Sequence, residues 1–189
     1  SSDRGAEIRR QLLGSPVDPR IARLRFFAAR GRRFNTVMAA LLRAFGQIGA
    51  ADMLSCFGHG DTDHYWRTVM RQQSFEERFR NMLRADGFDA VLMPAFATPA
   101  YRHGQAIDLG VAGTYASLWN VLGWPAGIVP ITRIRAEETP TRAATGDRAV
   151  RAAIECERDA TGLPVAVQIA APLWQESRVL ALMHALEAR

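Results

Sequence analysis

Residues 115–131 read YASLWNVLGWPAGIVPI, and this stretch decides how the rest of the chain is interpreted. Its apolar residues before position 123 recur at helical spacing, which predicts a short helix. Gly123 can end that helix with a positive φ, and Pro125 cannot continue it. The β-branched run at 126–129, closed by Pro130, is typical of a fully buried strand. A helix, a sharp turn and a strand in such close succession indicate an α/β fold with a site near the turn.

Two more segments predict buried strands, FDAVLMP at 88–94 and VAVQI at 165–169. Amphipathic spacing predicts helices over 20–34, 36–54, 64–84, 148–159 and 175–187, with Asp18-Pro19 starting the first and Asp63 capping the third. Strands that alternate with helices indicate an α/β fold. Three strands that each need cover on both faces are few, so we expect a portion of a larger sheet.

The blocks N-x-L-G-W-P-A-G at 120–127 and GLPVAVQ at 162–168, with WQE at 174–176, resemble the C-terminal part of the amidase-signature hydrolases. Within that family they look most like the fatty acid amide hydrolase branch. The resemblance spans residues 63–189 and extends more loosely over 1–62. It implies the C-terminal portion of a mixed β-sheet flanked by helices, incomplete without its N-terminal half.

The resemblance implies amide hydrolysis by a Ser–Ser–Lys triad, which in the family lies upstream in a Gly/Ser-rich stretch. All 24 basic residues of this chain are arginine, and its one Ser-Ser pair, Ser1-Ser2, has no glycine loop around it. We therefore assign no catalytic residue and expect no cofactor. The chain is predicted to supply sheet strands and a pocket wall. Its expected partners are a small-molecule amide substrate and the N-terminal half of the same enzyme.

In the resembled branch, the segment matching residues 110–117 lines the channel for the acyl chain. Here it reads GVAGTYAS, which is smaller and more polar than a channel for a long acyl chain requires. Gly113 and Ser117 are the residues we predict to bind substrate. The alternative is that this segment belongs to the core or to the surface.

Charge is distributed unevenly along the chain. Residues 1–50 hold ten arginines and three acidic residues, a net +7, whereas the other 139 residues hold 14 arginines and 16 acidic residues, a net −2. The predicted helix 20–34 places Leu24 and Phe27 on an apolar side fringed by Arg23 and Arg30. We predict that these four residues face a membrane, as an apolar helix with arginines at its edge does. The alternative is an amphipathic helix pair packed on the protein's own core.

This reading divides the chain into a basic amphipathic helical segment, 1–62, that caps the site, and the C-terminal part of the amidase α/β domain, 63–189. A function of another class stays open, namely a non-catalytic basic module that binds a membrane surface or nucleic acid through residues 20–43. The chain carries no recognisable nucleic-acid motif, so we expect no nucleic acid partner.

Cys56 and Cys156 form no CxxC pattern, and residues 1–10 contain no apolar signal core, so a cytoplasmic location with peripheral membrane contact is expected. Unpaired strand edges would favour a homo-oligomer. In the loop FGHGDTDH at 57–64, His59, Asp61, Asp63 and His64 are of metal-binding type. We favour the interpretation that they form a solvated loop with a helix cap, and we assign no metal.

Overall fold

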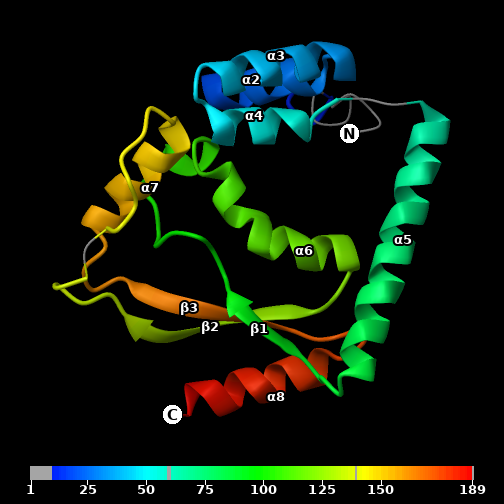
Figure 1. Ribbon diagram of the computed structural model, residues 1–189, viewed down its shortest axis with the longest axis vertical. Helices are drawn as coiled ribbons and strands as arrows, with labels where there is room; N and C mark the ends of the chain where they lie inside the picture. The colour runs from blue at the N-terminus through cyan, green and yellow to red at the C-terminus, as the bar shows by residue number, and fades with distance from the viewer. Residues whose placement is uncertain (1–9, 59–60, 139, 189) are drawn as a thin grey trace.

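The computed structural model describes residues 10–58, 61–138 and 140–188 (Figure 1). The first three helices in this part are α2 (Pro19–Ala28), α3 (Arg32–Ala44) and α4 (Ile48–Ser55). Then follow α5 (Thr62–Ala85), β1 (Val91–Pro94), the 3₁₀ turns η1 (Gln105–Ile107) and η2 (Gly110–Gly113), α6 (Thr114–Leu122), β2 (Ala126–Arg133), α7 (Arg148–Arg158), β3 (Pro164–Ala170) and α8 (Glu176–Glu187).

The predicted turn between α6 and β2 is confirmed. Gly123 ends α6 in the left-handed region with φ 67°, where a residue without Cβ is not strained. The N–H of Trp124 then returns to the carbonyl of Trp119 at 3.1 Å, which closes the helix. β2 begins two residues later, and Pro130 lies within the strand rather than ending it.

The three described strands form one sheet in the order β1-β3-β2, and both pairings are antiparallel. The α/β class is therefore confirmed for this part of the chain. The expectation of a mixed sheet is not met by the strands that are described, because both outer strands run opposite to the central β3. The outer edges of β1 and β2 have no strand partner among the described residues.

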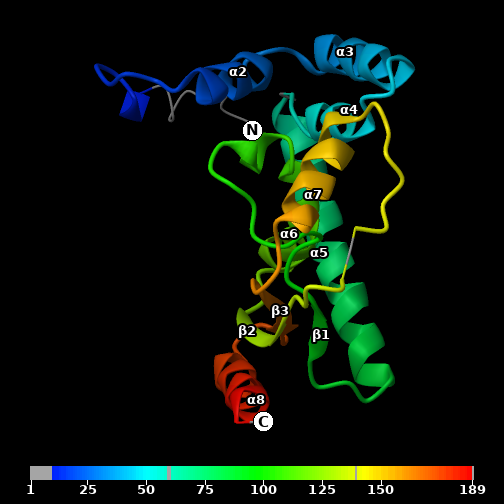
Figure 2. The ribbon, with the colours of Figure 1, turned by 90° about the vertical axis from the view of Figure 1, so that its left-hand side faces the viewer.

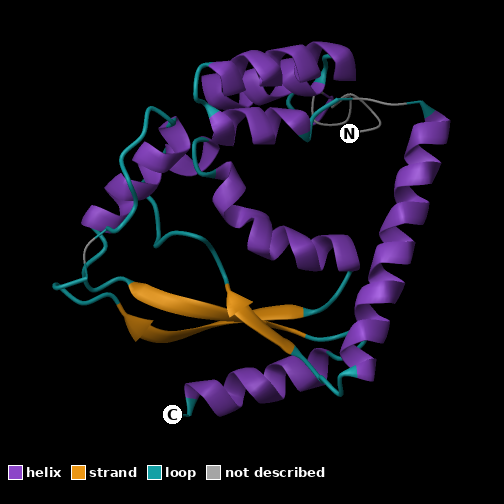
Figure 3. Ribbon diagram, in the orientation of Figure 1, coloured by secondary structure: helices purple, strands orange, loops and turns teal. Residues whose placement is uncertain are grey.

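Helices cover the two faces of the sheet unequally (Figure 3). α8 packs so closely on one face that a Cβ added to Gly127 would lie 2.1 Å from Sδ of Met183. On the other face, α5 and α6 build a core around two stacked indoles, Trp119 and Trp124, whose ring centroids are 6.1 Å apart. Leu83, Leu122 and Ala170 are the other buried members of this cluster.

The prediction that β2 is fully buried is wrong. Val129, on the face that carries Gly127, is 1% exposed, but Ile128 and Ile131 are 54% and 52% exposed. In Figure 3, α6 lies above the end of the sheet where β2 begins and rises away from the sheet toward the other end. The β-branched run therefore reflects packing on one face of β2.

The N-terminal helices also differ from the prediction. One helix over 20–34 was expected, but α2 begins at Pro19 as predicted and ends at Ala28. Gly31 is extended, with φ −68° and ψ 153°, and α3 starts just after it. The expected second helix, 36–54, is likewise divided into α3 and α4, where Gly46 turns the chain with φ 72°. Figure 2 shows α2 and α3 at the end of the molecule opposite the sheet.

The long helix α5 begins two residues before the prediction. Its cap is Asp61, whose Oδ1 accepts a hydrogen bond from the N–H of His64 at 2.7 Å. Asp63, which we predicted to cap the helix, pairs instead with Arg67 one turn along. Asp86 and Gly87 end the helix as expected.

Candidate substrate-binding site

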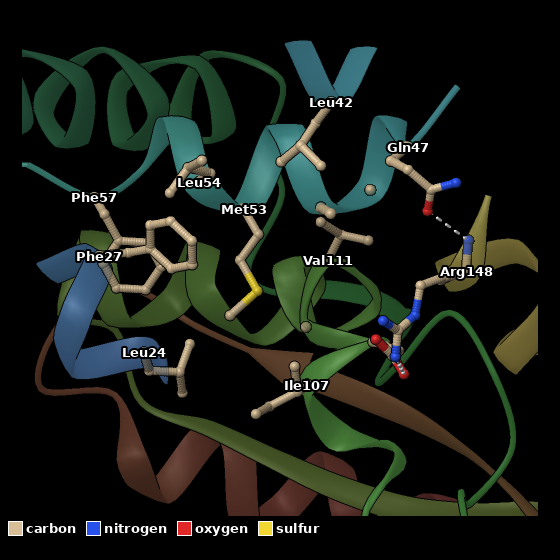
Figure 4. Close-up of a pocket in the computed structure, with 14 residues that line it drawn as sticks. Leu24, Phe27, Leu42, Gln47, Met53, Leu54, Phe57, Ile107, Val111 and Arg148 are labelled. Carbon is tan, nitrogen blue, oxygen red and sulfur yellow. Dashed lines mark hydrogen bonds and ion pairs between the residues drawn. The ribbon is translucent and has the colours of Figure 1, made fainter. Parts of the chain in front are cut away.

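An apolar cavity of about 380 Å³ lies where the N-terminal helices meet η1, η2 and the start of α7 (Figure 4). This volume falls within the range of small-molecule pockets. The chain builds it from segments far apart in sequence. The apolar side chains that line it are Leu24, Phe27, Leu42, Ala50, Met53, Leu54, Phe57, Ile107 and Val111.

Small residues let α3 and α4 approach closely behind this wall. Ala39 and Ala51 are 1% and 0% exposed and form a cluster with Leu54. Phe27 packs against the same cluster from α2. The buried Asn35 fastens α2 to α3, because its Nδ2 donates to the carbonyl of Phe27 at 3.1 Å. The apolar wall is thus held on a small helical unit with its own core.

The polar end of the cavity is fixed by two helix starts that cap each other. Asp147 accepts the N–H of Gly49 in α4 at 2.9 Å and the N–H of Ala149 in α7 at 2.9 Å. In return, Oε1 of Gln47 accepts the N–H of Arg148 at 3.2 Å, and its Nε2 donates to the carbonyl of Gly146 at 2.8 Å. These bonds satisfy N–H groups that the first turn of a helix otherwise leaves unpaired.

Gly49 has a steric reason to lack a side chain. A Cβ at this position would lie 2.6 Å from the Cβ of Ala149, closer than carbon atoms approach. The backbone of Gly49 in α4 therefore lies directly against the methyl group of Ala149 in α7. This contact sets the position of the N-terminal helices over the cavity.

One ion pair lies at the polar end. Nη2 of Arg148 contacts Oδ2 of Asp108 at 3.3 Å, and both residues line the cavity. The two side chains are 56% and 29% exposed. The cavity therefore has an apolar length and one end with a cationic and an anionic group.

The residues that we predicted to bind substrate lie beside this cavity rather than in its wall. Gly113 faces Phe96, and a Cβ there would lie 3.2 Å from Cε2 of that ring. Ser117 is exposed on α6, and its Oγ donates to the carbonyl of Gly113 at 3.3 Å. Gly110 and Val111, at the start of the same stretch, do line the cavity. A substrate contact by Gly113 or Ser117 stays a prediction.

Two of the four residues predicted to face a membrane point inward. Leu24 and Phe27 are half-buried and line the cavity, as expected if this helix packs on the protein's own core. A membrane contact by Leu24 or Phe27 stays a prediction. Arg30 is exposed, with its guanidinium carbon 4.2 Å from the centroid of the Phe26 ring. The side chain of Arg23 lies outside the described part.

Sequence reasoning did not find Gln47, Asp108 or Arg148. Each stands at or near the start of a helical turn, and no motif or spacing joins them. Gln47 and Arg148 are brought together only because α4 and α7 begin at the same point. Their polarity beside an apolar wall is a property of the folded chain.

The metal reading of the polar loop gains no support from the described residues. Asp61 caps α5 and Asp63 is paired with Arg67, while His59 lies outside the described part. Within the ranges that the structure describes, no three His, Cys, Asp or Glu side chains converge on one point.

Cys156 is buried on α7, and this burial is the largest cause that raises the pKa of its thiol. The neighbouring Glu155 and Glu157 raise it further, whereas the backbone N–H of Arg102 opposes the shift. The thiol donates to Oε1 of Gln105 at 3.2 Å. A protonated, hydrogen-bonded thiol is a weak nucleophile, so Cys156 has a packing role here.

The described part of the chain is a helix-and-sheet segment with an apolar cavity beneath its N-terminal helices. Residues 6–180 match the family model described as Amidase, so the chain belongs to the amidase family. This confirms the family inferred from the blocks at 120–127 and 162–176.

Two named relatives come from the branch that the sequence resembles. Fatty acid amide hydrolase 1 of Caenorhabditis elegans is 29% identical over 118 residues, which cover 61% of this chain and 21% of that protein. Fatty-acid amide hydrolase 1 of Sus scrofa is 33% identical over 114 residues, covering 55% and 18%. The chain thus spans about a fifth of the length of these relatives.

Proposed function

We propose that this chain is the part of an amide hydrolase that adds strands to the sheet and forms a wall of the acyl pocket. The catalytic Ser–Ser–Lys residues, in this proposal, lie upstream of the chain. The observation that carries the proposal is the cavity, because an apolar length with one polar end suits a chain-like substrate. Membership of the amidase family supplies the reaction class.

The position of the apolar wall bears on the substrate. By itself, the small and polar stretch 110–117 is a poor lining for a channel that holds a long acyl chain. In the structure, most of the apolar surface comes instead from α2–α4, with Phe27, Met53 and Phe57 among its largest side chains. We infer an amide with an extended acyl group as substrate. The test is whether the chain binds such an amide without hydrolysing it.

The unpaired edges of β1 and β2 support an N-terminal half as partner. Edge strands present free N–H and C=O groups that pair readily with another strand. In the proposal the upstream half covers such an edge and the exposed Ile128 and Ile131. A second copy of the chain is the alternative occupant, and analytical ultracentrifugation of the purified chain distinguishes the two.

We also propose that the outer face of the N-terminal helices contacts a membrane. Within the described ranges no helix combines the length and apolar character needed to span one. The exposed face of α3 and its ends is nevertheless apolar, and arginines flank it. Its exposed apolar side chains are Phe34, Val37, Leu41, Phe45 and Ile48, at 42%, 60%, 48%, 79% and 48%. Such a face inserts shallowly into an interface while arginines meet the phosphates.

Phe45→Asp is therefore expected to abolish sedimentation of the chain with anionic vesicles at low salt and to leave the melting temperature unchanged. Phe45 is 79% exposed, so its loss removes little folded-state packing. Phe27→Asp should instead unfold the protein, because it places a charge in a packed core. Leu180→Asp, on the exposed side of α8, is the matched control. Failure of the folded wild-type chain to bind vesicles at low salt would refute the membrane face.

A further inference from the structure

We propose that the cavity binds amphiphiles that carry a carboxylate, with the carboxylate on Arg148 and the alkyl chain along the apolar wall. The inference rests on the proposed function and deepens it, because hydrolysis of an amide with an extended acyl group releases such a carboxylate. It names the residue that selects the head group.

The shape of the cavity sets the orientation of such a ligand. Figure 4 shows Phe27, Phe57 and Leu24 grouped at one end and the guanidinium of Arg148 at the other, with Met53, Ile107 and Val111 between them. Pockets of this kind hold a ligand by apolar area and orient it by a few polar groups. An alkyl chain can therefore extend from Arg148 toward the two phenylalanines.

The charged groups at this end favour an anion. Arg148 is the one cationic side chain among the described residues that line the cavity. It stands at the first position of α7, where the helix dipole is positive, and the start of α4 meets the same point. The nearby carboxylate of Asp147 is already held by the N–H groups of Gly49 and Ala149. Asp147 is therefore not free to take Arg148 as a partner.

Asp108 is the competing anion, and its hold on Arg148 is weak. The pair makes one contact, at 3.3 Å, and more than half of the Arg148 side chain is exposed. Exposed ion pairs of this kind contribute little to stability, because water screens the two charges. A guanidinium carries five N–H donors, so most of them are left for a ligand carboxylate. A carboxylate can accept two parallel N–H···O bonds from a guanidinium, and this bidentate geometry makes the contact strong. In the proposal, the ligand carboxylate displaces the carboxylate of Asp108 from Arg148.

The test is isothermal titration calorimetry with three amphiphiles of equal chain length, decanoate, decanol and decylamine, each below its micelle-forming concentration. Decanoate is expected to bind the wild-type chain about tenfold or more tightly than decanol, the size of a charge-assisted hydrogen bond. Arg148→Gln should remove this preference and leave decanol binding unchanged. Asp108→Asn should tighten decanoate binding, because the competing carboxylate is gone.

Arg151→Gln is the matched control, since Arg151 is exposed on the same helix and does not line the cavity. Thermal melts of each variant show whether the fold is kept, and Arg148→Gln retains the backbone N–H that bonds to Gln47. Equal binding of decanoate and decanol, stronger binding of decylamine, or decanoate binding that survives Arg148→Gln would each overturn the proposal. Amide binding is measured separately, so a failure here leaves the proposed function standing.

Discussion

Replacing Trp119 with alanine is expected to lower the free energy of unfolding by about 3–5 kcal/mol, the usual cost of truncating a buried tryptophan. Trp119 is 2% exposed and stacks on Trp124, and the Phe79 ring meets its edge with centroids 6.5 Å apart. Its removal leaves a cavity where α5, α6 and the sheet meet. Chemical denaturation followed by circular dichroism measures the change.

Trp174→Ala is the control for this prediction, because Trp174 is 79% exposed and its loss should change stability by less than about 0.5 kcal/mol. Trp119→Phe should cost less than Trp119→Ala, since it keeps the ring and removes an indole N–H that has no partner among the described residues. A cost below about 1 kcal/mol for Trp119→Ala would contradict the packing described here.

Asp147→Ala is expected to lower the free energy of unfolding by about 2–4 kcal/mol, because one carboxylate caps two helices. Its loss leaves the N–H groups of Gly49 and Ala149 without their acceptor in a buried place, where Asp147 itself is 6% exposed. Such groups are costly when unpaired. Hydrogen exchange should show faster exchange in the first turns of both α4 and α7.

Asp61→Ala gives the comparison, since Asp61 caps one exposed helix start and should cost only about 1 kcal/mol. Exchange that quickens in α7 but not in α4 after Asp147→Ala would show that Asp147 does not join the two helices. Thermal melting of the same variants separates local opening from global unfolding.

The parts of the fold that local chemistry determines were predictable from the sequence. Gly123 and Pro125 indicated the turn after α6, and Asp18-Pro19 indicated the start of α2. Side-chain burial was harder to predict, because a β-branched run such as 126–129 looks the same in sequence whether one face of the strand or both faces are covered. Ile128 is exposed although its sequence context resembles that of a core residue.

The cavity could not be predicted, because its parts meet only in three dimensions. Phe27 and Leu24 have the spacing of a membrane-facing stripe, and in the folded chain both also line the cavity. Gln47 and Arg148 are 101 residues apart. Within the stretch 110–117, Gly110 and Val111 line the cavity, whereas Gly113 and Ser117, the residues predicted to bind substrate, do not.

The central claim, an acyl-binding wall without its own catalytic residues, is tested most directly by equilibrium dialysis of the chain against dodecanamide, with amide and dodecanoic acid both quantified by mass spectrometry. The account predicts that the chain retains the amide, that all of it is recovered intact, and that Val111→Trp, which fills the cavity, abolishes retention. Release of dodecanoic acid that stops when one of the seven serines is replaced by alanine would contradict it.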